Sequence, residues 1–285
     1  INTNETHKYM LMRGRYTYMN EIMYNTFPKL IGSPNNISHS AICAEAEKFG
    51  RYYTEGMWEY ADADLDNCKY LLSWGWDGVA SNRQTPWFIN QLGYVKDKAR
   101  ITVIDPRLSA TAAKADRWLP IIPGMDGALQ MAIAHVILSE GRWNKSFVGD
   151  FEDGKNYFIP GSVVPTEVIV EEKPVPVVFK EKHTYGLVQW WNLELKERTP
   201  EWAEKLTGIS AKEIKEVARE FVAAGSRAIS WVSPGASMQV RGAYSSFGGH
   251  ALNGLVGSVD AEGGILQGSS APSGKMPDYK PYLNE

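Results

Sequence analysis

The chain has 285 residues, of which 44% are hydrophobic and 22% charged, and its formal net charge at pH 7 is −3. This composition predicts a globular protein of one large or two smaller domains, and the lack of any basic run argues against a nucleic-acid partner. No stretch approaches 18 apolar residues and only two cysteines are present, so neither a membrane-spanning helix nor a disulfide framework is predicted. The polar, proline-broken end PDYKPYLNE and the start without Met indicate an internal segment of a longer polypeptide.

The first feature along the chain is a pair of arginines in a predicted loop, Arg13-Gly14-Arg15-Tyr16, which precedes a mixed helical stretch over residues 18–30. Two guanidinium groups that flank a glycine are suited to grip a tetrahedral oxyanion through forked hydrogen bonds. A solvated pair of loop side chains is the alternative, and the local sequence leaves both interpretations open.

A cysteine-bearing segment follows at residues 38–60. Ala, Glu and Lys dominate its residues 41–48, which favours a helix with Gly50 as its stop. His39 and Cys43 are four residues apart and would share one face of that helix. Taken alone, this spacing favours a buried cysteine on an ordinary helix.

Strands and helices alternate from residue 69 onward. Hydrophobic periodicity predicts buried strands at residues 70–75, 100–105, 118–122 and 227–233, and helices at 86–98, 127–140, 199–224 and 243–256. Thr199-Pro200 and the SAKE sequence at Ser210 are typical helix starts. This alternation predicts a parallel sheet of the doubly wound α/β kind.

Several residues fall where the predicted strands end. Ligands of doubly wound sheets bind past the carboxyl ends of the strands, where Trp74-Gly75, Asp105 and Asp126 lie. An acidic residue after a strand commonly holds ribose hydroxyls, and one that caps a helix can hold a guanine edge. An ordinary turn aspartate and an ordinary capping aspartate are the alternatives. Because the chain has no GxGxxG, a nicotinamide site is not predicted.

Three further stretches carry less functional information. Residues 147–182 are irregular and are interpreted as an insertion, in which VIVEEKPVPVVF is a candidate hairpin. Gly263-Gly264 and Gly268-Ser269-Ser270 predict loops that approach another part closely. Cys68 precedes a buried strand and is predicted to be a packed thiol.

The motifs YLLSWGWDGVASNRQ, ITVIDPRLSATAAKADRWLPIIPGMDGAL and TPEWAEKLTGISAKEIKEVAREF occur in one order, before a glycine-rich tail. As a set they resemble the molybdopterin oxidoreductases of the dimethyl-sulfoxide-reductase family, over nearly the whole chain. The resemblance implies an α/β fold with doubly wound, mostly parallel sheets in two intertwined domains. The molybdenum and substrate side would be a discontinuous domain of residues 1–68 and 226–285, and residues 69–225 would form a dinucleotide cradle.

Within the family, the catalytic subunits of respiratory arsenate reductases look most similar. The matching stretches are RGRY, SPNNISHSAICAEAEKFG, YYTEG, HTYGLVQWWNLELK and PGASMQVRG. This resemblance implies oxygen-atom transfer from arsenate to give arsenite. Arsenite oxidation and the reduction of polysulfide, thiosulfate or tetrathionate are alternatives within the family, and a non-catalytic α/β nucleotide-binding module is the alternative outside it.

The resemblance also implies individual roles. Cys43 would ligate molybdenum, which is otherwise held by two molybdopterin guanine dinucleotides. The oxyanion pocket would be lined by Arg15, Tyr16, His39, Lys48 and Tyr60. The dinucleotide would contact Trp74, Gly75, Asp77, Asp105, Arg107 and Asp126, and the pterin surroundings would include Gly235, Gln239 and Arg241. Trp76-Asp77-Gly78 departs from the small residue and Asn/Asp-Pro usual in the family, which predicts a different local turn at Asp77.

The chemistry of these side chains suits the implied reaction. A guanidinium and an ammonium group neutralise an oxyanion, and tyrosine hydroxyls donate hydrogen bonds to it. An imidazole such as that of His39 can carry a proton near neutral pH. By resemblance, the complete protein would also hold a 4Fe–4S cluster, pair with an iron–sulfur electron-transfer subunit and reside in the periplasm, whereas this chain alone would be inactive.

Overall fold

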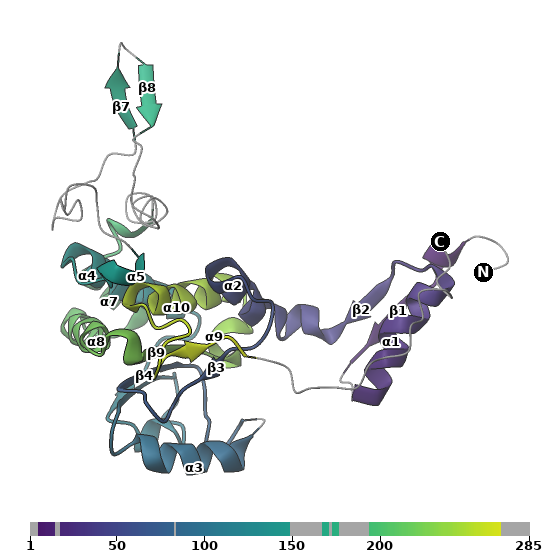
Figure 1. Ribbon diagram of the computed structural model, residues 1–285, viewed down its shortest axis with the longest axis horizontal. Helices are drawn as coiled ribbons and strands as arrows, with labels where there is room; N and C mark the ends of the chain where they lie inside the picture. Colours follow the sequence, from purple (N-terminus) through teal and green to yellow (C-terminus); the bar gives the residue numbers. More distant parts are fainter. Residues whose placement is uncertain are drawn as a thin grey trace. The chain divides into compact units, whose positions relative to one another are not determined.

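The computed structural model (Figure 1) describes residues 5–14, 18–82, 84–148, 167–170, 173–176 and 194–268. Two compact units divide the chain: Ile1–Glu45 with Ser269–Glu285, and Ala46–Gly268. These units differ from the predicted division into 1–68 with 226–285 and 69–225. The reason is that residues near 230 form a strand beside residues 70–74, in one sheet of the larger unit.

The described part of the first unit is a small β–α–β arrangement. Strands β1 (Leu11–Arg13) and β2 (Asn36–Ser38) pair in parallel, and helix α1 (Tyr18–Ile31) connects them. A 3-10 turn, η1 (Thr6–Lys8), precedes β1. The helix predicted over residues 18–30 is therefore confirmed.

The cysteine-bearing segment is not the single α-helix that its composition predicted. The hydroxyl of Ser38 accepts a hydrogen bond from the Ser40 amide at 3.2 Å, and this local turn starts a 3-10 helix, η2 (His39–Ile42). Cys43 ends η2 with φ −128° and ψ −86°, which is not a helical conformation. The prediction that His39 and Cys43 share one face of an α-helix is therefore wrong.

Helix α2 (Glu45–Glu55) runs through Gly50, so the prediction that this glycine stops the helix is also wrong. Gly50 instead permits a close approach to helix α10 (Gly242–Val256). A β-carbon on Gly50 would lie 2.3 Å from the amide nitrogen of Phe247, which is closer than real contacts allow. The helix ends before Gly56, whose φ of +77° suits a glycine after a helix.

The larger unit is built on a four-stranded parallel sheet in the order β6–β5–β4–β9. Its strands are β4 (Tyr70–Trp74), β5 (Arg100–Ile104), β6 (Arg117–Leu119) and β9 (Ala228–Val232). Strands β5 and β9 lie on opposite sides of β4, so the order of strands reverses between β4 and β9. This reversal is a topological switch point, where open α/β sheets bind their ligands.

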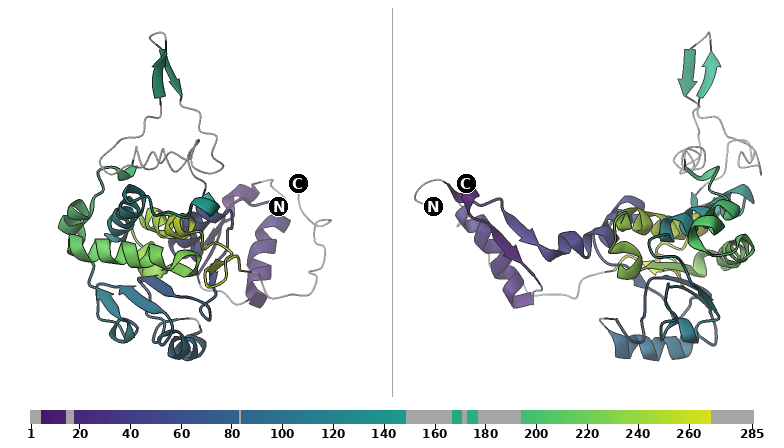
Figure 2. Two further views of the ribbon diagram at one scale, coloured as in Figure 1. Left: turned by 60° about the vertical axis from the view of Figure 1, so that its left-hand side comes forward. Right: turned by 180° about the vertical axis from the view of Figure 1, so that it is seen from behind.

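Helices cover both faces of this sheet, as Figure 1 and both views in Figure 2 show. One face is covered by α3 (Thr85–Val95), and the other by α4 (Asp126–Ser139), α7 (Pro200–Thr207), α8 (Ala211–Ala223) and α10. Leu71 belongs to the core with Phe88 of α3, whereas its neighbour Leu72 belongs to the core with Ile133 of α4. The prediction of a doubly wound α/β sheet is confirmed.

The remaining elements are short. They are β3 (Asp62–Ala63), which pairs antiparallel with β10 (Ile265–Leu266), η3 (Ala112–Lys114), α5 (Lys145–Val148), η6 (Gly225–Arg227) and α9 (Pro234–Ser237). Strands β7 (Glu167–Val170) and β8 (Lys173–Pro176) form an antiparallel pair, which confirms the predicted hairpin. The rest of the predicted insertion between residues 149 and 182 lies outside the described residues.

Local signals read from the sequence hold in three places. The Thr199 hydroxyl accepts from the Trp202 amide, and Ser210 with Glu213 forms a capping box. Cys68 is 2% exposed, and burial raises the pKa of its thiol to about 12, so it is a packed thiol as predicted.

Of the helices in the described parts of the chain, none combines the length and the apolar character that crossing a bilayer requires.

Candidate functional site

A cavity of about 410 Å³ lies at the switch point, past the carboxyl ends of β4, β5 and β9. We call it the switch-point cavity. Seven of the nine residues predicted to contact the cofactor line it: Gly75, Asp77, Asp105, Arg107, Asp126, Gly235 and Gln239. The sheet brings them together because the carboxyl ends of parallel strands meet at one edge.

Two glycines hold the loops after β4 and β9 against each other. The Gly235 amide donates to the Gly75 carbonyl oxygen at 3.1 Å. A β-carbon on Gly75 would lie 2.5 Å from the Ala236 amide nitrogen, and one on Gly235 would lie 2.4 Å from the Gly75 oxygen. Gly75 also has a φ of +60°. Main chain, and not side chain, therefore forms this part of the cavity wall.

A third glycine of the cavity wall, Gly124, lies directly against the side chain of Gln239. Gly124 has a φ of +85°, and a β-carbon there would lie 2.8 Å from the Gln239 side-chain oxygen. The Gln239 side-chain nitrogen donates to the Ala236 carbonyl at 3.0 Å and lies 3.4 Å from an oxygen of Asp126. Gln239 is therefore oriented toward the acidic side of the cavity.

Asp126 is the first residue of α4, so the prediction that it caps this helix is wrong. Met125 occupies the N-cap position and makes no side-chain capping bond. Asp126 is 4% exposed, and burial raises the pKa of its carboxyl to about 6. The negative charge of Asp105 contributes to this rise, whereas hydrogen bonds from the backbone amide of Asp126 and from Gln239 limit it. At neutral pH the protein thus keeps an incompletely neutralised carboxylate in the cavity wall.

Asp105 and Asp77 are held in place differently. One carboxylate oxygen of Asp105 accepts from the Arg107 amide at 2.9 Å. Asp77 is bound within the protein: one oxygen accepts from the amide and the hydroxyl of Thr111 at 3.0 and 2.9 Å, and the other lies 3.6 Å from the Arg107 guanidinium. The Arg107 side chain is 73% exposed.

Trp74 and Arg241 do not line the cavity. The Trp74 side chain is fully buried in the core, and its indole nitrogen donates to the Ser230 hydroxyl at 2.9 Å. Arg241 is exposed and precedes α10 with a φ of +74°, in the left-handed region that a non-glycine residue rarely adopts.

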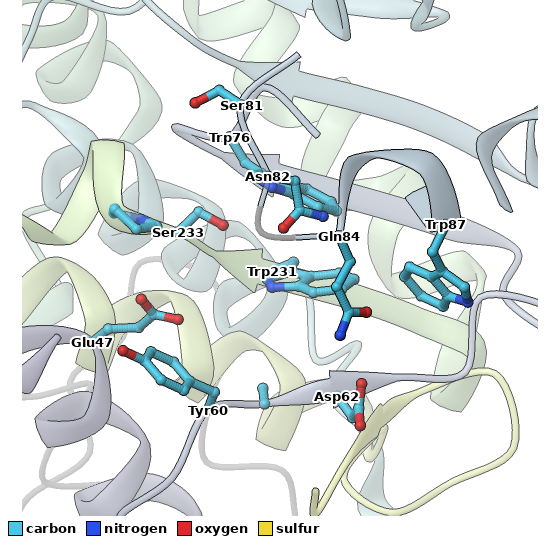
Figure 3. A pocket seen from close by; sticks show the side chains of 12 residues that line it. Glu47, Tyr60, Asp62, Trp76, Ser81, Asn82, Gln84, Trp87, Trp231 and Ser233 are labelled. Carbon is cyan, nitrogen blue, oxygen red and sulfur yellow. The ribbon is translucent and has the colours of Figure 1, made fainter. Parts of the chain in front are cut away.

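A second cavity, of about 290 Å³, adjoins the first and shares Trp76, Ser81 and Pro234 with it. Figure 3 shows Trp76, Trp231 and Trp87 along its wall, and we call it the tryptophan cavity. The rings of Trp76 and Trp231 stack with centroids 4.5 Å apart. Sequence reasoning missed Trp87 of α3 and Trp231 of β9, because these two elements are far apart in the sequence and come to one cavity only in the fold.

Two of the residues predicted to bind an oxyanion meet beside this cavity. The ammonium group of Lys48 lies 4.9 Å from the centre of the Tyr60 ring and 3.6 Å from a carboxylate oxygen of Glu59. Tyr60 lines the tryptophan cavity, together with the carboxylates of Glu47 and Asp62 (Figure 3). These carboxylates would repel an anion, whereas the Lys48 ammonium group carries the charge that attracts one.

The other predicted pocket residues belong to the first unit. Cys43 is a half-buried free thiol at the end of η2, and His39 begins that turn. Arg15 and Tyr16 lie outside the described residues. Within the part of the chain that is described, no three His, Cys, Asp or Glu side chains gather as a metal site.

A sequence model described as molybdopterin oxidoreductase matches residues 2–276. The chain therefore belongs to the molybdopterin oxidoreductase family, whose members use a molybdenum–pterin cofactor.

Two curated relatives are each 51% identical to the chain: the arsenate respiratory reductase molybdopterin-containing subunits ArrA of Chrysiogenes arsenatis and of Shewanella sp. (strain ANA-3). The matches span 282 and 283 residues, which is 99% of this chain and 32% of each relative. The chain thus spans about a third of their length. Among solved structures, acetylene hydratase from Pelobacter acetylenicus matches with a TM-score of 0.65 and 24% identity, over 90% of this chain and 31% of that one. This likeness shows the fold.

Proposed function

We propose that the chain forms part of a molybdenum-dependent respiratory arsenate reductase, in which it holds one cofactor dinucleotide and contributes to the arsenate pocket. The 51% identity with two arsenate respiratory reductase subunits, over 99% of the chain, carries this proposal. In the proposed reaction, arsenate takes up two electrons and two protons and yields arsenite and water.

The switch-point cavity fits a guanine dinucleotide end of the cofactor. The Gly75–Gly235 contact leaves main chain where a phosphate-bearing ligand must approach closely. Asp105, after β5, is placed to accept from ribose hydroxyls. Asp126 would accept hydrogen bonds from the N–H groups of a guanine edge, and such donors would lower its raised pKa. By the resemblance to the family, the cofactor would be a bis(molybdopterin guanine dinucleotide) of molybdenum.

The chain's own side chains would bind and orient the substrate. The cofactor, when bound, supplies the two-electron redox centre, and Cys43 offers the soft thiolate ligand that molybdenum accepts. Arsenate carries about −1.5 to −2 charges near neutral pH by analogy with phosphate, so it needs cations. Lys48 provides a positive charge beside Tyr60. The Tyr60 hydroxyl would donate a hydrogen bond to the oxyanion. His39 would move protons, and Arg15 and Tyr16 would complete the pocket.

Electrons would arrive from an iron–sulfur subunit through a 4Fe–4S cluster of the complete protein, in the periplasm. These assignments rest on the resemblance to respiratory arsenate reductases.

The two cysteines provide a matched test in the complete protein. Cys43→Ala should abolish arsenate turnover because it removes the proposed metal ligand, whereas Cys68→Ala should retain turnover and molybdenum because Cys68 is enclosed in the core. Molybdenum content and the rate of arsenate reduction are measured for both variants. Normal turnover in Cys43→Ala would contradict the assignment.

Lys48 is tested against a second lysine that also lies over an aromatic ring. Lys48→Ala should raise the arsenate KM about tenfold or more, since a charge-assisted bond contributes roughly 1.5–3 kcal/mol. Lys145 lies 5.3 Å from the centre of the Trp143 ring, away from both cavities, and Lys145→Ala should leave the KM unchanged. An equal effect of the two substitutions would count against an anion-binding role for Lys48.

A further inference from the structure

Three ionisable side chains form a buried network next to Lys48 that the sequence did not reveal. The side chains of Arg51 and Glu55 are each 1% exposed, and His250 is 2% exposed. The Arg51 Nε donates to one Glu55 oxygen at 2.7 Å, and the Nδ1 of His250 lies 2.7 Å from the other. Arg51 and Glu55 belong to α2, whereas His250 belongs to α10.

The remaining nitrogens of Arg51 hold main-chain carbonyl oxygens. Nη1 donates to the carbonyl of Glu59 at 3.1 Å and to that of Tyr60, and Nη2 donates to the carbonyl of Leu266 at 2.8 Å. One guanidinium thus ties α2 to the segment before β3 and to β10. A planar fork of donors can serve all these acceptors at once, which an ammonium group cannot do with the same geometry.

Both ends of this network bear on the Lys48–Tyr60 pair. Lys48 precedes Arg51 by three residues on α2, and α2 is fixed against α10 by the main-chain contact at Gly50. Tyr60 has its carbonyl held by Arg51, and two residues later the chain enters the β3–β10 pairing. These contacts fix the main chain on both sides of the Tyr60 ring, which therefore stays beside the Lys48 ammonium group.

We propose that Arg51 is a positioning residue for arsenate binding, acting through the carbonyls of Glu59 and Tyr60 to hold the Tyr60 side chain against Lys48. This inference rests on the proposed function for its substrate. Arg51 does not contact the substrate in this account. It sets the geometry of two groups that do, with Glu55 and His250 holding the guanidinium in turn.

The test is Arg51→Lys in the complete, molybdenum-loaded protein, with Arg117→Lys as control. Arg117 is also a largely buried arginine, 16% exposed, but it binds Glu216 and Glu220 of α8 and lines neither cavity. Arg51→Lys should raise the arsenate KM about tenfold with kcat within about threefold and molybdenum content unchanged, since bonds of charged groups are at stake. Arg117→Lys should change neither constant.

A double-mutant cycle separates positioning from general stability. If Arg51 acts through the Tyr60 side chain, Tyr60→Phe and Arg51→Lys should be non-additive in KM, the double variant being little worse than the more affected single one. Amide hydrogen exchange of residues 56–64 should accelerate in Arg51→Lys, while that of residues 70–74 stays unchanged. Additive KM effects, or a fall in kcat at constant KM, would overturn the proposal.

A failure of the proposed function can be told apart from a failure of the role proposed for Arg51. If the wild-type protein reduces a sulfur oxyanion and not arsenate, the function is wrong, and the same cycle with that anion still decides the role of Arg51. If Arg51→Lys does not fold, His250→Gln serves instead, because it withdraws the Nδ1 donor from Glu55 and leaves Arg51 in place. It should raise the KM about threefold with the same non-additivity toward Tyr60→Phe, and an unchanged KM would overturn the proposal.

Discussion

Burial acts in the same direction on two carboxyl groups of the larger unit, Glu55 and Asp126, but their pKa values shift in opposite directions. Burial alone would raise the pKa of Glu55, but hydrogen bonds and charges from His250 and Arg51 outweigh it and lower the pKa. Burial raises the pKa of Asp126 to about 6, and Asp105 adds to the effect. The charge of Glu55 is balanced by Arg51 and His250. Asp126 accepts hydrogen bonds from its own backbone amide and from Gln239, but these do not offset the effect of burial. This contrast separates a group that holds the structure together from one that awaits a ligand.

The largest expected effect is at Glu55. Glu55→Gln leaves the buried guanidinium of Arg51 without a counter-charge, and we expect it to lower the free energy of unfolding by about 3–5 kcal/mol at pH 7. Because the folded-state pKa of Glu55 is lowered, its contribution is present above the ordinary pKa of 4.5 and is lost as the pH falls through the folded pKa. Urea unfolding at pH 7 and at acid pH measures both. A loss below about 1 kcal/mol at pH 7 would show that Glu55 does not hold the buried guanidinium in place.

The effect at Asp126 should have the opposite sign. Its folded-state pKa is raised from 3.8 to about 6, so its stabilising contribution is complete below 3.8 and is lost as the pH rises through 6. Asp126→Asn should therefore stabilise the cofactor-free protein by about 1–3 kcal/mol at pH 8 and by almost nothing at pH 4. The same substitution should weaken cofactor retention. Thermal unfolding at the two pH values decides the matter, and destabilisation at pH 8 is the contrary result.

The smallest effect is expected at a solvent-exposed pair, which sharpens the role of burial. Arg227 and Glu262 lie 2.6 Å apart with side chains 39% and 62% exposed. Glu262→Gln should change the free energy of unfolding by less than about 1 kcal/mol, because water and salt screen such pairs. The change is measured by urea unfolding with and without 0.5 M salt. A cost as large as that of Glu55→Gln would mean that pairing, and not burial, sets these energies.

Much of the sheet and of the switch-point cavity was predictable from sequence. Apolar runs predicted the ends of β4, β5 and β9 to within about one residue. The SAKE sequence at Ser210 predicted the capping box. Once the strands are known to be parallel, Asp105 and Gly235 must fall at one edge. Local pattern and one rule of sheet topology therefore bring most of the predicted cofactor residues together.

Contacts between distant segments were not predictable. Gly50 was predicted to stop a helix, because nothing near it in the sequence shows that α2 passes close to Phe247 at this position. The i,i+4 spacing of Arg51 and Glu55 is visible in the sequence, but nothing local indicates that His250, 195 residues from Glu55, completes the network. The error at Cys43 is of another kind: the Ser38 hydroxyl offers the backbone a local turn that competes with the α-helix.

We propose above all that this chain belongs to a protein that reduces arsenate at molybdenum. The most direct measurement is the oxidation of a reduced viologen by the complete protein, with arsenate, thiosulfate, tetrathionate or polysulfide as acceptor, and the reverse assay with arsenite and an oxidised dye. We expect one arsenite to form from arsenate for every two electrons consumed, at a rate proportional to bound molybdenum, and no arsenite to form with Cys43→Ala. Turnover of a sulfur oxyanion or of arsenite alone, with arsenate left unreduced, would contradict it.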